Sequence, residues 1–567
     1  MSPESGVDEA STSRDAPSCG RSRATDRWAP GRNALLFVGL SLLLFAVYLP
    51  SLGGSFLSDD FQVLVNNPYV NALSIENLLA IFDPSAAEKS FTGNYAPIDE
   101  ILTAIERHFF GDQVFLYHLV NLLLHALNTG LLIAWLRGAG LPAPTALLGG
   151  LFFALHPANV EAVAWMSQLK TVASLSLSLA ALLAFRSAPL ISTVFFGAAL
   201  LTKASALFAL PAVAAWTWVH PEPGYRHWRW VAVWALVFAL YAIPEFASFQ
   251  SFGAAASPGF ADGFEQLRSM AAFFSRYAAM ATTSHGLSAF HEPAPARSLL
   301  DPWWLAALPL LAGLAWRAVA VLRSRREEAV FWVAAAAGYA PISQIFPFLY
   351  PMGDRYLYFV LPGLIGALSL LGVDALARAR AGRPGALPAA VSRGAVGVAV
   401  GVAIVFGLRS NQRAAVWRDE TRLFLDAERH YPNGGPASLL QARRAAQVGD
   451  ADAAVVALAR AEAAGLGNFM VLPSDPGLAP IAGSPAFRDF VRGMAGRWIE
   501  RSRKWPTMNQ AQYHLLAHAH MLRDELPEAR EALTRALDAG GPQQEELRAE
   551  LKQLRGESAA PPVDSNA

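Results

Sequence analysis

The sequence predicts an all-α, polytopic membrane protein that carries a helical domain at its C-terminal end. The chain has 567 residues, too many for one ordinary soluble domain. Its residues are 53% hydrophobic and only 16% charged, which is typical of membrane proteins. Apolar runs recur through residues 33–409, and the composition then becomes rich in Ala, Arg and Glu. The formal net charge is zero, so no nucleic-acid partner is indicated.

Residues 1–32 are polar and precede the first apolar run. They are rich in Ser, Arg and Asp, which predicts a disordered cytoplasmic tail. The single cysteine, Cys19, lies here, so the chain offers no intrachain disulfide and no thiolate metal site. The apolar run that follows lacks a clear small-residue cleavage site. We therefore expect a membrane anchor and not a removed signal peptide.

About eleven apolar runs reach the length of roughly 20 residues that a membrane crossing needs. Their centres lie near Leu42, Leu124, Phe152, Leu179, Phe195, Ala212, Leu236, Leu310, Ala336, Leu364 and Val400. Lys and Arg residues follow every second run, which places the N-terminus in the cytoplasm and the loop 51–112 outside. The same alternation places everything after Arg409 outside. It holds only if residues 270–284 lie along the outer surface and do not cross.

Two adjacent carboxylates, Asp59 and Asp60, directly follow the first apolar run. At the edge of the bilayer a carboxylate can stay ionised and still reach a substrate held at the membrane surface. A solvated loop with helix-capping Asp residues is the simpler interpretation of such a pair taken alone. Adjacent side chains point in opposite directions in extended backbone, so we expect the two residues to have different roles.

Polar side chains also interrupt the following apolar runs. His118, Asn121, His125 and Asn128 are spaced by three, four and three residues, so they share one helix face. Substrate contact and interhelical hydrogen bonds both explain such a face. A proline-broken link after the third run is tolerated only where it is buried in protein or lines a cavity. The residues predicted to line a substrate cavity are Tyr95, His118, His125, His156 and Glu161.

Three basic residues fall at the same predicted outer face: Lys170, Lys203 and Arg355. A lone Lys or Arg at a membrane face is commonly a snorkelling side chain. Three together favour an anionic ligand, and phosphate is the natural candidate. Side chains of this kind can neutralise a phosphate, so no metal site is predicted, although a divalent metal is left open.

Four sequence runs then carry a resemblance to a known family. They are Asp59-Asp60 with Asn67-Pro68, residues 117–125 (Tyr-His-Leu-Val-Asn-Leu-Leu-Leu-His), residues 156–165 and residues 354–358 (Asp-Arg-Tyr-Leu-Tyr). In this order, and with the C-terminal helices, they resemble the transmembrane and tetratricopeptide-repeat O-mannosyltransferase family and its bacterial relatives. These are membrane glycosyltransferases of the GT-C fold. The resemblance runs over most of residues 33–420.

Three departures from the family pattern leave the donor sugar open. Where the family often has Tyr-Arg-Pro-Leu, this chain has Tyr-Ala-Pro-Ile at residues 95–98. A Gly-Arg-Lys/Ala-Asp element is replaced by Gln-Leu-Lys-Thr at 168–171, and a Ser-Lys-Glu element by Thr-Lys-Ala at 202–204. An arginine and an acid are lost by these changes.

The last part of the chain, residues 410–556, predicts a degenerate tetratricopeptide-like domain, followed by a disordered tail at 557–567. Ala454, Leu458 and Ala461 are spaced by four and three residues. Residues 529, 533 and 536 repeat this small-large-small pattern, at which the second helix of such a repeat packs on the first. A generic helical domain is the alternative.

The resemblance implies an enzyme that moves mannose or a similar hexose from a polyprenyl-phosphate donor to an acceptor hydroxyl. The base is an acid of the first outer loop, with Asp59 favoured over Asp60 because the family motif leads with the catalytic Asp. The acceptor is a protein Ser or Thr or a glycan that the helical repeats could present. No cofactor is expected. A transporter and a non-catalytic, membrane-anchored scaffold are the alternatives. The Ala/Gly/Arg-rich, cysteine-poor composition suggests a bacterial inner membrane.

Overall fold

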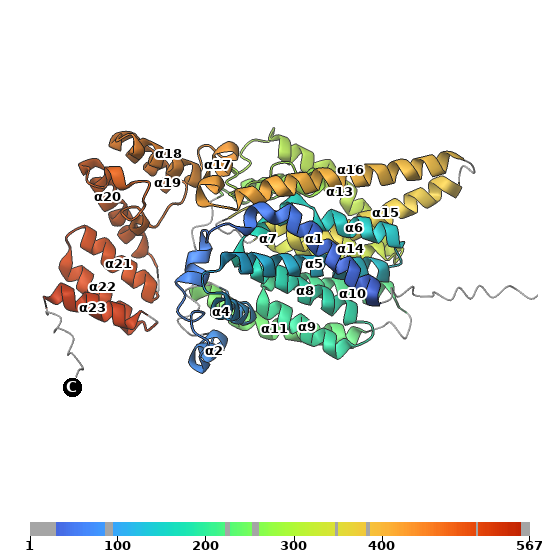
Figure 1. The fold of residues 1–567 in the computed structure, drawn as a ribbon, viewed down its shortest axis with the longest axis horizontal. Helices are drawn as coiled ribbons and strands as arrows, with labels where there is room; N and C mark the ends of the chain where they lie inside the picture. Colours follow the sequence, from blue (N-terminus) through green and yellow to red (C-terminus); the bar gives the residue numbers. More distant parts are fainter. Residues whose placement is uncertain are drawn as a thin grey trace, which may run out of the picture.

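The computed structural model describes residues 30–84, 94–221, 227–251, 260–345, 350–381, 386–505, 508–541 and 543–556. Figure 1 shows a bundle of long helices beside a smaller group of C-terminal helices, and no strand occurs in these ranges. The chain is thus an all-α, multi-pass membrane protein, as predicted. Of the tails expected to be disordered, residues up to 29 and from 557 lie outside the described residues, whereas residues 30–32 belong to the first helix.

Six helices in the described part of the chain are long and apolar enough to cross a membrane. They are α1 (Pro30–Leu52), α5 (Val114–Gly138), α8 (Leu169–Ala184) together with the preceding turn from Met166, α11 (Trp228–Ser251), α13 (Pro302–Arg323) and α15 (Leu361–Ala381). A seventh crossing results if α6 (Ala143–Ala154) and the segment Pro157–Ala164 are counted as one span bent by 48°.

The other predicted crossings are helical as well, but three of them are short. Helices α9 (Pro189–Thr202), α10 (Ala209–Val219) and α14 (Glu328–Tyr339) have 14, 11 and 12 residues. A bilayer needs roughly 20 residues at about 1.5 Å per residue. The last predicted crossing forms α16 (Ala386–Val416), of 31 residues. Helix length therefore supports fewer complete crossings than the predicted eleven, because breaks divide several apolar runs.

Small residues let the bundle helices approach closely. A Cβ atom at Gly363 of α15 would lie 2.4 Å from the backbone nitrogen of Ala335 in α14. A Cβ atom at Gly366 would lie 2.0 Å from Cδ1 of Phe331. Alanine at either position would therefore force α14 and α15 apart. Helix α5 packs against α1, α6 and α8, and α1 also packs against α16.

The predicted outer loop folds back onto the ends of the bundle helices. It contains α2 (Ile75–Phe82) and α4 (Pro97–Phe110). Proline at the first position of α4 is suited to a helix start, since its missing N–H would have no helical partner there. Helix α4 packs against α5, α8 and α9. The acidic first turn of α4 is thereby brought to the polar ends of α8 and α9.

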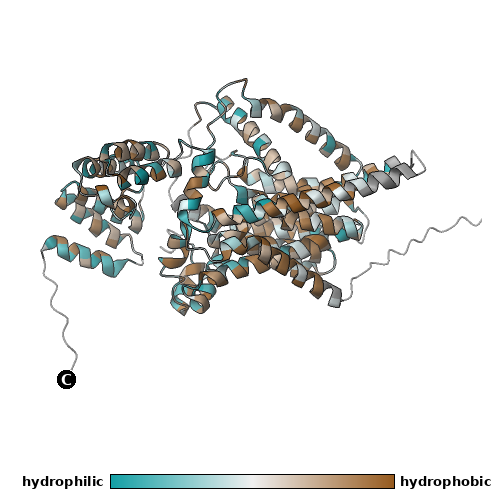
Figure 2. Ribbon diagram, turned by 45° about the horizontal axis from the view of Figure 1, so that its top comes forward, coloured by the Kyte–Doolittle hydropathy of each residue, from teal (hydrophilic) through white to brown (hydrophobic). Residues whose placement is uncertain are grey.

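The C-terminal part consists of helices that pair with their neighbours. They are α17 (Glu420–His430), α18 (Gly435–Gln447), α19 (Ala451–Ala463), α20 (Pro485–Ser502), α21 (Gln510–Leu522), α22 (Leu526–Asp538) and α23 (Gln544–Arg555). Helix α18 pairs with α19, and α21 pairs with α22. In Figure 2 these helices mix hydrophilic and hydrophobic residues, whereas the bundle helices are mainly hydrophobic. The predicted domain boundary at residues 409 and 410 falls inside α16.

The small-large-small positions lie where the helices of each pair meet. Ala454, Leu458 and Ala461 of α19 are fully buried. Ala529, Leu533 and Ala536 of α22 are fully buried too. Both sets therefore serve the helix packing that their spacing indicated. Residues 464–484, which contain two short 3₁₀ turns, and α20 separate the two pairs.

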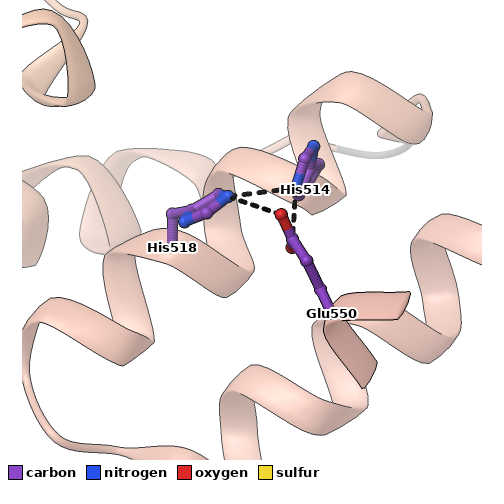
Figure 3. A group of neighbouring side chains, drawn as sticks. All are labelled: His514, His518 and Glu550. Carbon is purple, nitrogen blue, oxygen red and sulfur yellow. Dashed lines mark hydrogen bonds and ion pairs between the residues drawn. The ribbon is translucent and has the colours of Figure 1, made fainter. Parts of the chain in front are cut away.

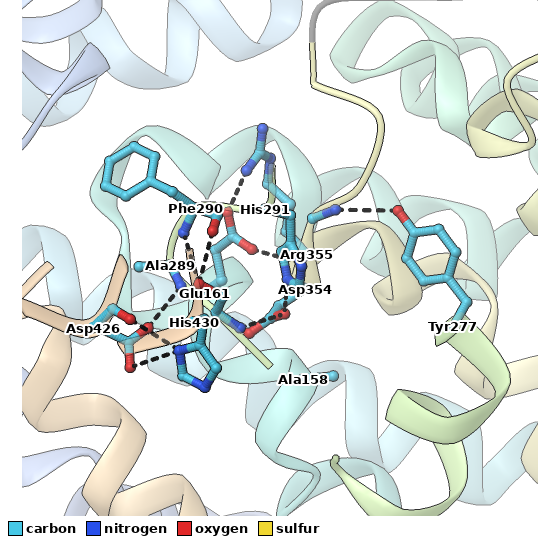
Figure 4. A network of polar contacts seen from close by, with 12 residues as sticks. Ala158, Glu161, Tyr277, Ala289, Phe290, His291, Asp354, Arg355, Asp426 and His430 are labelled. Carbon is cyan, nitrogen blue, oxygen red and sulfur yellow. Dashed lines mark hydrogen bonds and ion pairs between the residues drawn. The ribbon is translucent and has the colours of Figure 1, made fainter. Parts of the chain in front are cut away.

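A buried polar network joins the bundle to the C-terminal helices (Figure 4). Asp354 accepts hydrogen bonds from His291 Nε2 at 2.7 Å and from the Arg413 guanidinium at 3.1 Å. The same guanidinium donates to both oxygens of Asp426 in α17, at 2.8 and 2.9 Å. The side chains of Asp354 and Asp426 are 1% and 7% exposed. One arginine thus neutralises two buried carboxylates from different parts of the chain.

We expect Arg413→Met to destabilise the protein strongly. The substitution removes the guanidinium that the two carboxylates share and leaves them with His291, the more distant His430 and backbone N–H donors. Breaking a buried ion pair costs about 3–5 kcal/mol. Thermal unfolding of the detergent-purified chain measures this effect. Arg422→Met is the matched control, because its pair with Asp419 is 45% and 42% exposed and such pairs contribute about 0–1 kcal/mol. Equal losses of stability in the two variants would show that the buried network contributes no more than an exposed ion pair.

Candidate active site

The two neighbouring aspartates of the outer loop lie in opposite environments. A turn with Ser58 in the left-handed region, at φ 49°, separates them from the end of α1. Asp60 is fully buried, whereas Asp59 is exposed. The one hydrogen bond found for the Asp59 carboxylate comes from the neighbouring Ser58 hydroxyl, at 3.2 Å. Only Asp59 therefore presents its carboxylate outward.

The Asp60 carboxylate ties the loop to the broken helix of the bundle. Its Oδ2 accepts the backbone N–H of Leu57 at 2.8 Å, which closes the turn. Its Oδ1 accepts the backbone N–H of Ser167 at 2.9 Å and also the Ser167 hydroxyl. Burial raises the pKa of Asp60 to about 7, and the hydrogen bonds from Ser167 and Leu57 act in the opposite direction. These contacts are those of a residue that positions the loop.

The broken segment itself is buried throughout. It comprises η2 (Pro157–Asn159), α7 (Val160–Ala164) and η3 (Met166–Gln168). Its Trp165 stacks on Trp417 of the C-terminal end of α16 at 5.4 Å and donates its indole N–H to the Leu57 carbonyl at 3.3 Å. The segment therefore holds the aspartate loop from one side and α16 from another. This burial is the environment that a non-helical link in a membrane protein requires.

Arg355 reaches the same place from η7 (Asp354–Phe359). Its guanidinium forms an ion pair with Glu161, and its backbone N–H donates to the same carboxylate at 2.8 Å. The guanidinium carbon lies 5.2 Å from the ring centre of Trp165 and 4.8 Å from that of Tyr356. Asp59 also acts electrostatically on Arg355. An arginine held by a carboxylate and two rings is a fixed cation.

Lys170 and Lys203 complete a group of cations around Arg355. Lys203 follows the last residue of α9, and its Nζ donates to the Thr171 hydroxyl at 2.6 Å. The charges of Lys170 and Arg355 both act on Lys203, so the three predicted phosphate ligands are neighbours. Lys170 lies in the first turn of α8 and forms no hydrogen bond or ion pair with the described residues. We call Lys170, Lys203 and Arg355 the cation cluster.

A further acid joins this cluster that the sequence did not single out as a site residue. Asp99, in the first turn of α4, is 5% exposed, and its Oδ1 has no hydrogen-bond partner in the described part of the chain. Burial raises the pKa of Asp99 to about 6, while the charges of Lys170 and Lys203 lower it. Asp99 thus lies beside the two lysines. The only sequence signal for Asp99 is that it falls in the first turn of a helix that begins at Pro97.

The predicted cavity residues other than Glu161 lie in the packed interior. The two nitrogens of His125 contact the Tyr358 hydroxyl at 2.8 Å and the Ala154 carbonyl at 3.1 Å. His156 contacts the Ala281 carbonyl at 3.0 Å and accepts the N–H of Ala158 at 3.2 Å. With both nitrogens of each ring engaged between segments of the bundle, these contacts favour interhelical hydrogen bonding over substrate contact.

The remaining polar residues of the α5 face and Tyr95 are buried as well. His118 is 2% exposed, and neither of its ring nitrogens has a hydrogen-bond partner in the described part of the chain. Asn121 donates to the carbonyl of Trp165 at 3.2 Å. Asn128 donates to the carbonyl of Val172 at 2.8 Å. Tyr95 donates its N–H to Glu245 at 2.8 Å and its hydroxyl to the Phe82 carbonyl at 2.8 Å, which fixes the start of α4.

Comparisons with known proteins support a relationship over part of the chain. Protein O-mannosyl-transferase Tmtc1 of Drosophila melanogaster is 32% identical over 184 residues, which are 30% of this chain and 21% of that protein. Protein O-mannosyl-transferase F38B6.6 of Caenorhabditis elegans is 30% identical over 162 residues, 27% and 22% of the two chains. Protein O-mannosyl-transferase TMTC1 of Homo sapiens is 33% identical over 146 residues, 24% and 16%.

No family model and no solved structure matches this chain. The matches cover about a fifth of the length of the curated relatives. Over about a quarter of its own residues, the chain is therefore similar to proteins named O-mannosyl-transferases.

Proposed function

We propose that this protein is a membrane glycosyltransferase that moves mannose, or a similar hexose, from a polyprenyl-phosphate donor to a hydroxyl of a protein acceptor. The observation that carries the proposal is the exposed carboxylate of Asp59 beside the cation cluster. A base for the acceptor and a site for an anionic leaving group are the two elements that this reaction needs. The names of the curated relatives support the same reaction class.

The reaction is written as a single displacement with inversion. Asp59 accepts the proton of the acceptor hydroxyl while its oxygen forms a bond to the anomeric carbon of the sugar. The bond from that carbon to the phosphate oxygen breaks, and the lipid phosphate leaves with the electron pair. Its negative charge grows in the transition state, where the cation cluster stabilises it. Asp60 acts on the loop and not on the substrate. The scheme uses side-chain cations, and we expect no cofactor or metal requirement.

The proposed side of the membrane follows from the charge pattern. Arginines precede the first crossing and recur after every second one, which supports a cytoplasmic N-terminus and an extracytoplasmic active site. The composition supports a bacterial inner membrane as the location. The C-terminal helices would then lie on the same side as Asp59, where they could present a protein acceptor.

Asp59→Asn should lower turnover by about 10²–10⁴-fold, because asparagine keeps the size of the side chain but cannot accept the proton. The measurement is transfer of labelled mannose from polyprenyl-phosphate mannose into protein by the purified chain. Asp60→Asn is the matched neighbour and should retain more transfer in the folded fraction. Normal transfer by the Asp59→Asn variant would remove the proposed base. A larger loss in Asp60→Asn would exchange the two roles.

The buried carboxyl of Asp60 predicts a pH-dependent stability. Its folded-state pKa of about 7 lies above the unfolded value of about 3.9, so the folded state binds more protons between these pH values. The contribution of Asp60 to stability is therefore full below pH ~4 and is lost as the pH rises to about 7. Because asparagine does not titrate, the melting temperature of the wild type should fall relative to that of Asp60→Asn as the pH rises from about 4 to about 7. A difference between the two melting temperatures that stays constant over this range would contradict the raised pKa.

Lys170→Met should raise the KM for the lipid-phosphate donor by roughly ten- to a hundredfold. A hydrogen bond to a charged group contributes about 1.5–3 kcal/mol, and each 1.4 kcal/mol is about tenfold in affinity. Lys170 gives the clearest test of phosphate binding, since it forms no hydrogen bond or ion pair with the described residues whose loss would disturb the fold. Lys504→Met, at an exposed position of the C-terminal part, is the control. An unchanged KM in Lys170→Met would show that Lys170 does not bind the donor phosphate, and snorkelling would then explain its position.

Arg355 needs a different comparison, because Arg355→Met also leaves the buried Glu161 carboxylate without its cation. The double variant Arg355→Met/Glu161→Gln removes both charges and should recover stability. If Arg355 binds the donor phosphate, the double variant stays poor in donor use. Full recovery of both stability and transfer would reduce Arg355 to a structural role.

A further inference from the structure

Two histidines and a glutamate converge on the surface of the last three helices, away from the proposed active site. His514 and His518 are four residues apart on α21, so they share one helix face. Glu550 reaches them from α23. Figure 3 shows both imidazoles directed at the Glu550 carboxylate. The His514 Nε2 atom lies 2.9 Å from Glu550 Oε2 and 3.0 Å from His518 Nε2. His518 Nε2 lies 3.6 Å from Glu550 Oε1.

These distances bring potential ligand atoms of the three residues close enough to share a zinc ion. Zinc lies about 2.0–2.1 Å from each nitrogen or oxygen ligand, so two ligand atoms of a tetrahedral site are roughly 3.3 Å apart. The two ring nitrogens are 3.0 Å apart, and the two Glu550 oxygens lie 2.9 Å from His514 Nε2 and 3.6 Å from His518 Nε2. One ligand atom from each residue lies within 4.8 Å of the other two. Imidazole nitrogen and carboxylate oxygen are ligand types that Zn²⁺ prefers. We propose that His514, His518 and Glu550 form a zinc site that fastens α23 to α21.

The chemistry of the three groups supports a cation at this place. Two imidazole nitrogens 3.0 Å apart cannot both be acceptors without a proton or a cation between them. A glutamate carboxylate is ionised at neutral pH, as a ligand must be.

The position of the cluster explains what the ion would do for the fold. Its side chains are 12%, 26% and 26% exposed, so an ion can enter from solvent. The apolar core beneath it is small and uses only Leu547 and Leu551 from α23 among its buried residues. A metal that bridges α21 and α23 adds a second attachment for this helix. It also leaves a fourth coordination position for water.

Calorimetric titration of the full-length, untagged chain with Zn²⁺ tests the site. We expect one ion per chain at neutral pH in the wild type, with proton release on binding. His518→Ala and Glu550→Gln should weaken binding by more than the roughly 10- to 100-fold that changes to residues behind a ligand produce. His520→Ala is the matched control, because His520 lies on the same helix but pairs with Glu525 at 2.7 Å.

Limited trypsin digestion gives a second readout. Helix α23 contains Arg548, Lys552 and Arg555. Zn²⁺ should slow cleavage at these residues in the wild type and in His520→Ala but have no effect in Glu550→Gln, which keeps the size and hydrogen bonding of the side chain. No stoichiometric zinc in the wild type, or equal binding by wild type, His518→Ala and Glu550→Gln, would overturn the site and leave a hydrogen-bonded cluster.

Discussion

The buried segment at residues 156–168 is the constraint on which the rest of the bundle depends. Its helix is broken at Pro157, so some backbone groups lack the hydrogen-bond partners that a continuous helix provides. These groups and the polar side chains of the segment must find partners inside the protein. They do so with α5, with the aspartate loop and with η7. Ser167 holds Asp60, and Glu161 holds Arg355. The hydrogen bonds that satisfy the break are thus the same ones that place the candidate site.

In this arrangement the charged residues of the site differ in their partners. Arg355 is neutralised in part by Glu161 and Lys203 is held by Thr171, whereas Lys170 is not engaged by the described residues. Asp60 is enclosed by donors, and Asp59 is left to solvent. The charges of such a site are held in place before a ligand binds. Charges fixed in this way stabilise a transition state better than water does, because they need no reorganisation during the reaction.

Much of this could be predicted from the sequence, and the failures have physical reasons. Apolar length and helical spacing predicted the bundle and the packing of Leu458 and Leu533. Different orientations of Asp59 and Asp60 were expected from extended backbone, but Asp60 has helical backbone, with φ −59° and ψ −34°. Residue spacing shows which side chains share a helix face but not which segment packs against that face. The choice between substrate contact and interhelical hydrogen bonding for His125 therefore required the structure, in which Tyr358 contacts its ring. Asp99 belongs to a site only because α4 folds back onto α8 and α9. Helix length supports fewer than eleven full crossings, because the helices on the two sides of breaks such as the one at Lys203 have only 14 and 11 residues.

Helix α16 carries a consequence for how a protein acceptor would be handled. It runs about 46 Å without interruption, from the bundle to the start of the C-terminal helices, and Trp417 at its end stacks on Trp165 of the broken segment. The C-terminal helices are therefore not on a flexible tether. A flexible linker gives a bound segment a broad distribution of positions and an effective concentration that falls with linker length. A rigid connection confines a segment bound to these helices to one distance from Asp59. The modified hydroxyl would then be determined mainly by its distance along the polypeptide from the segment bound to the C-terminal helices. The residues next to that hydroxyl would matter less.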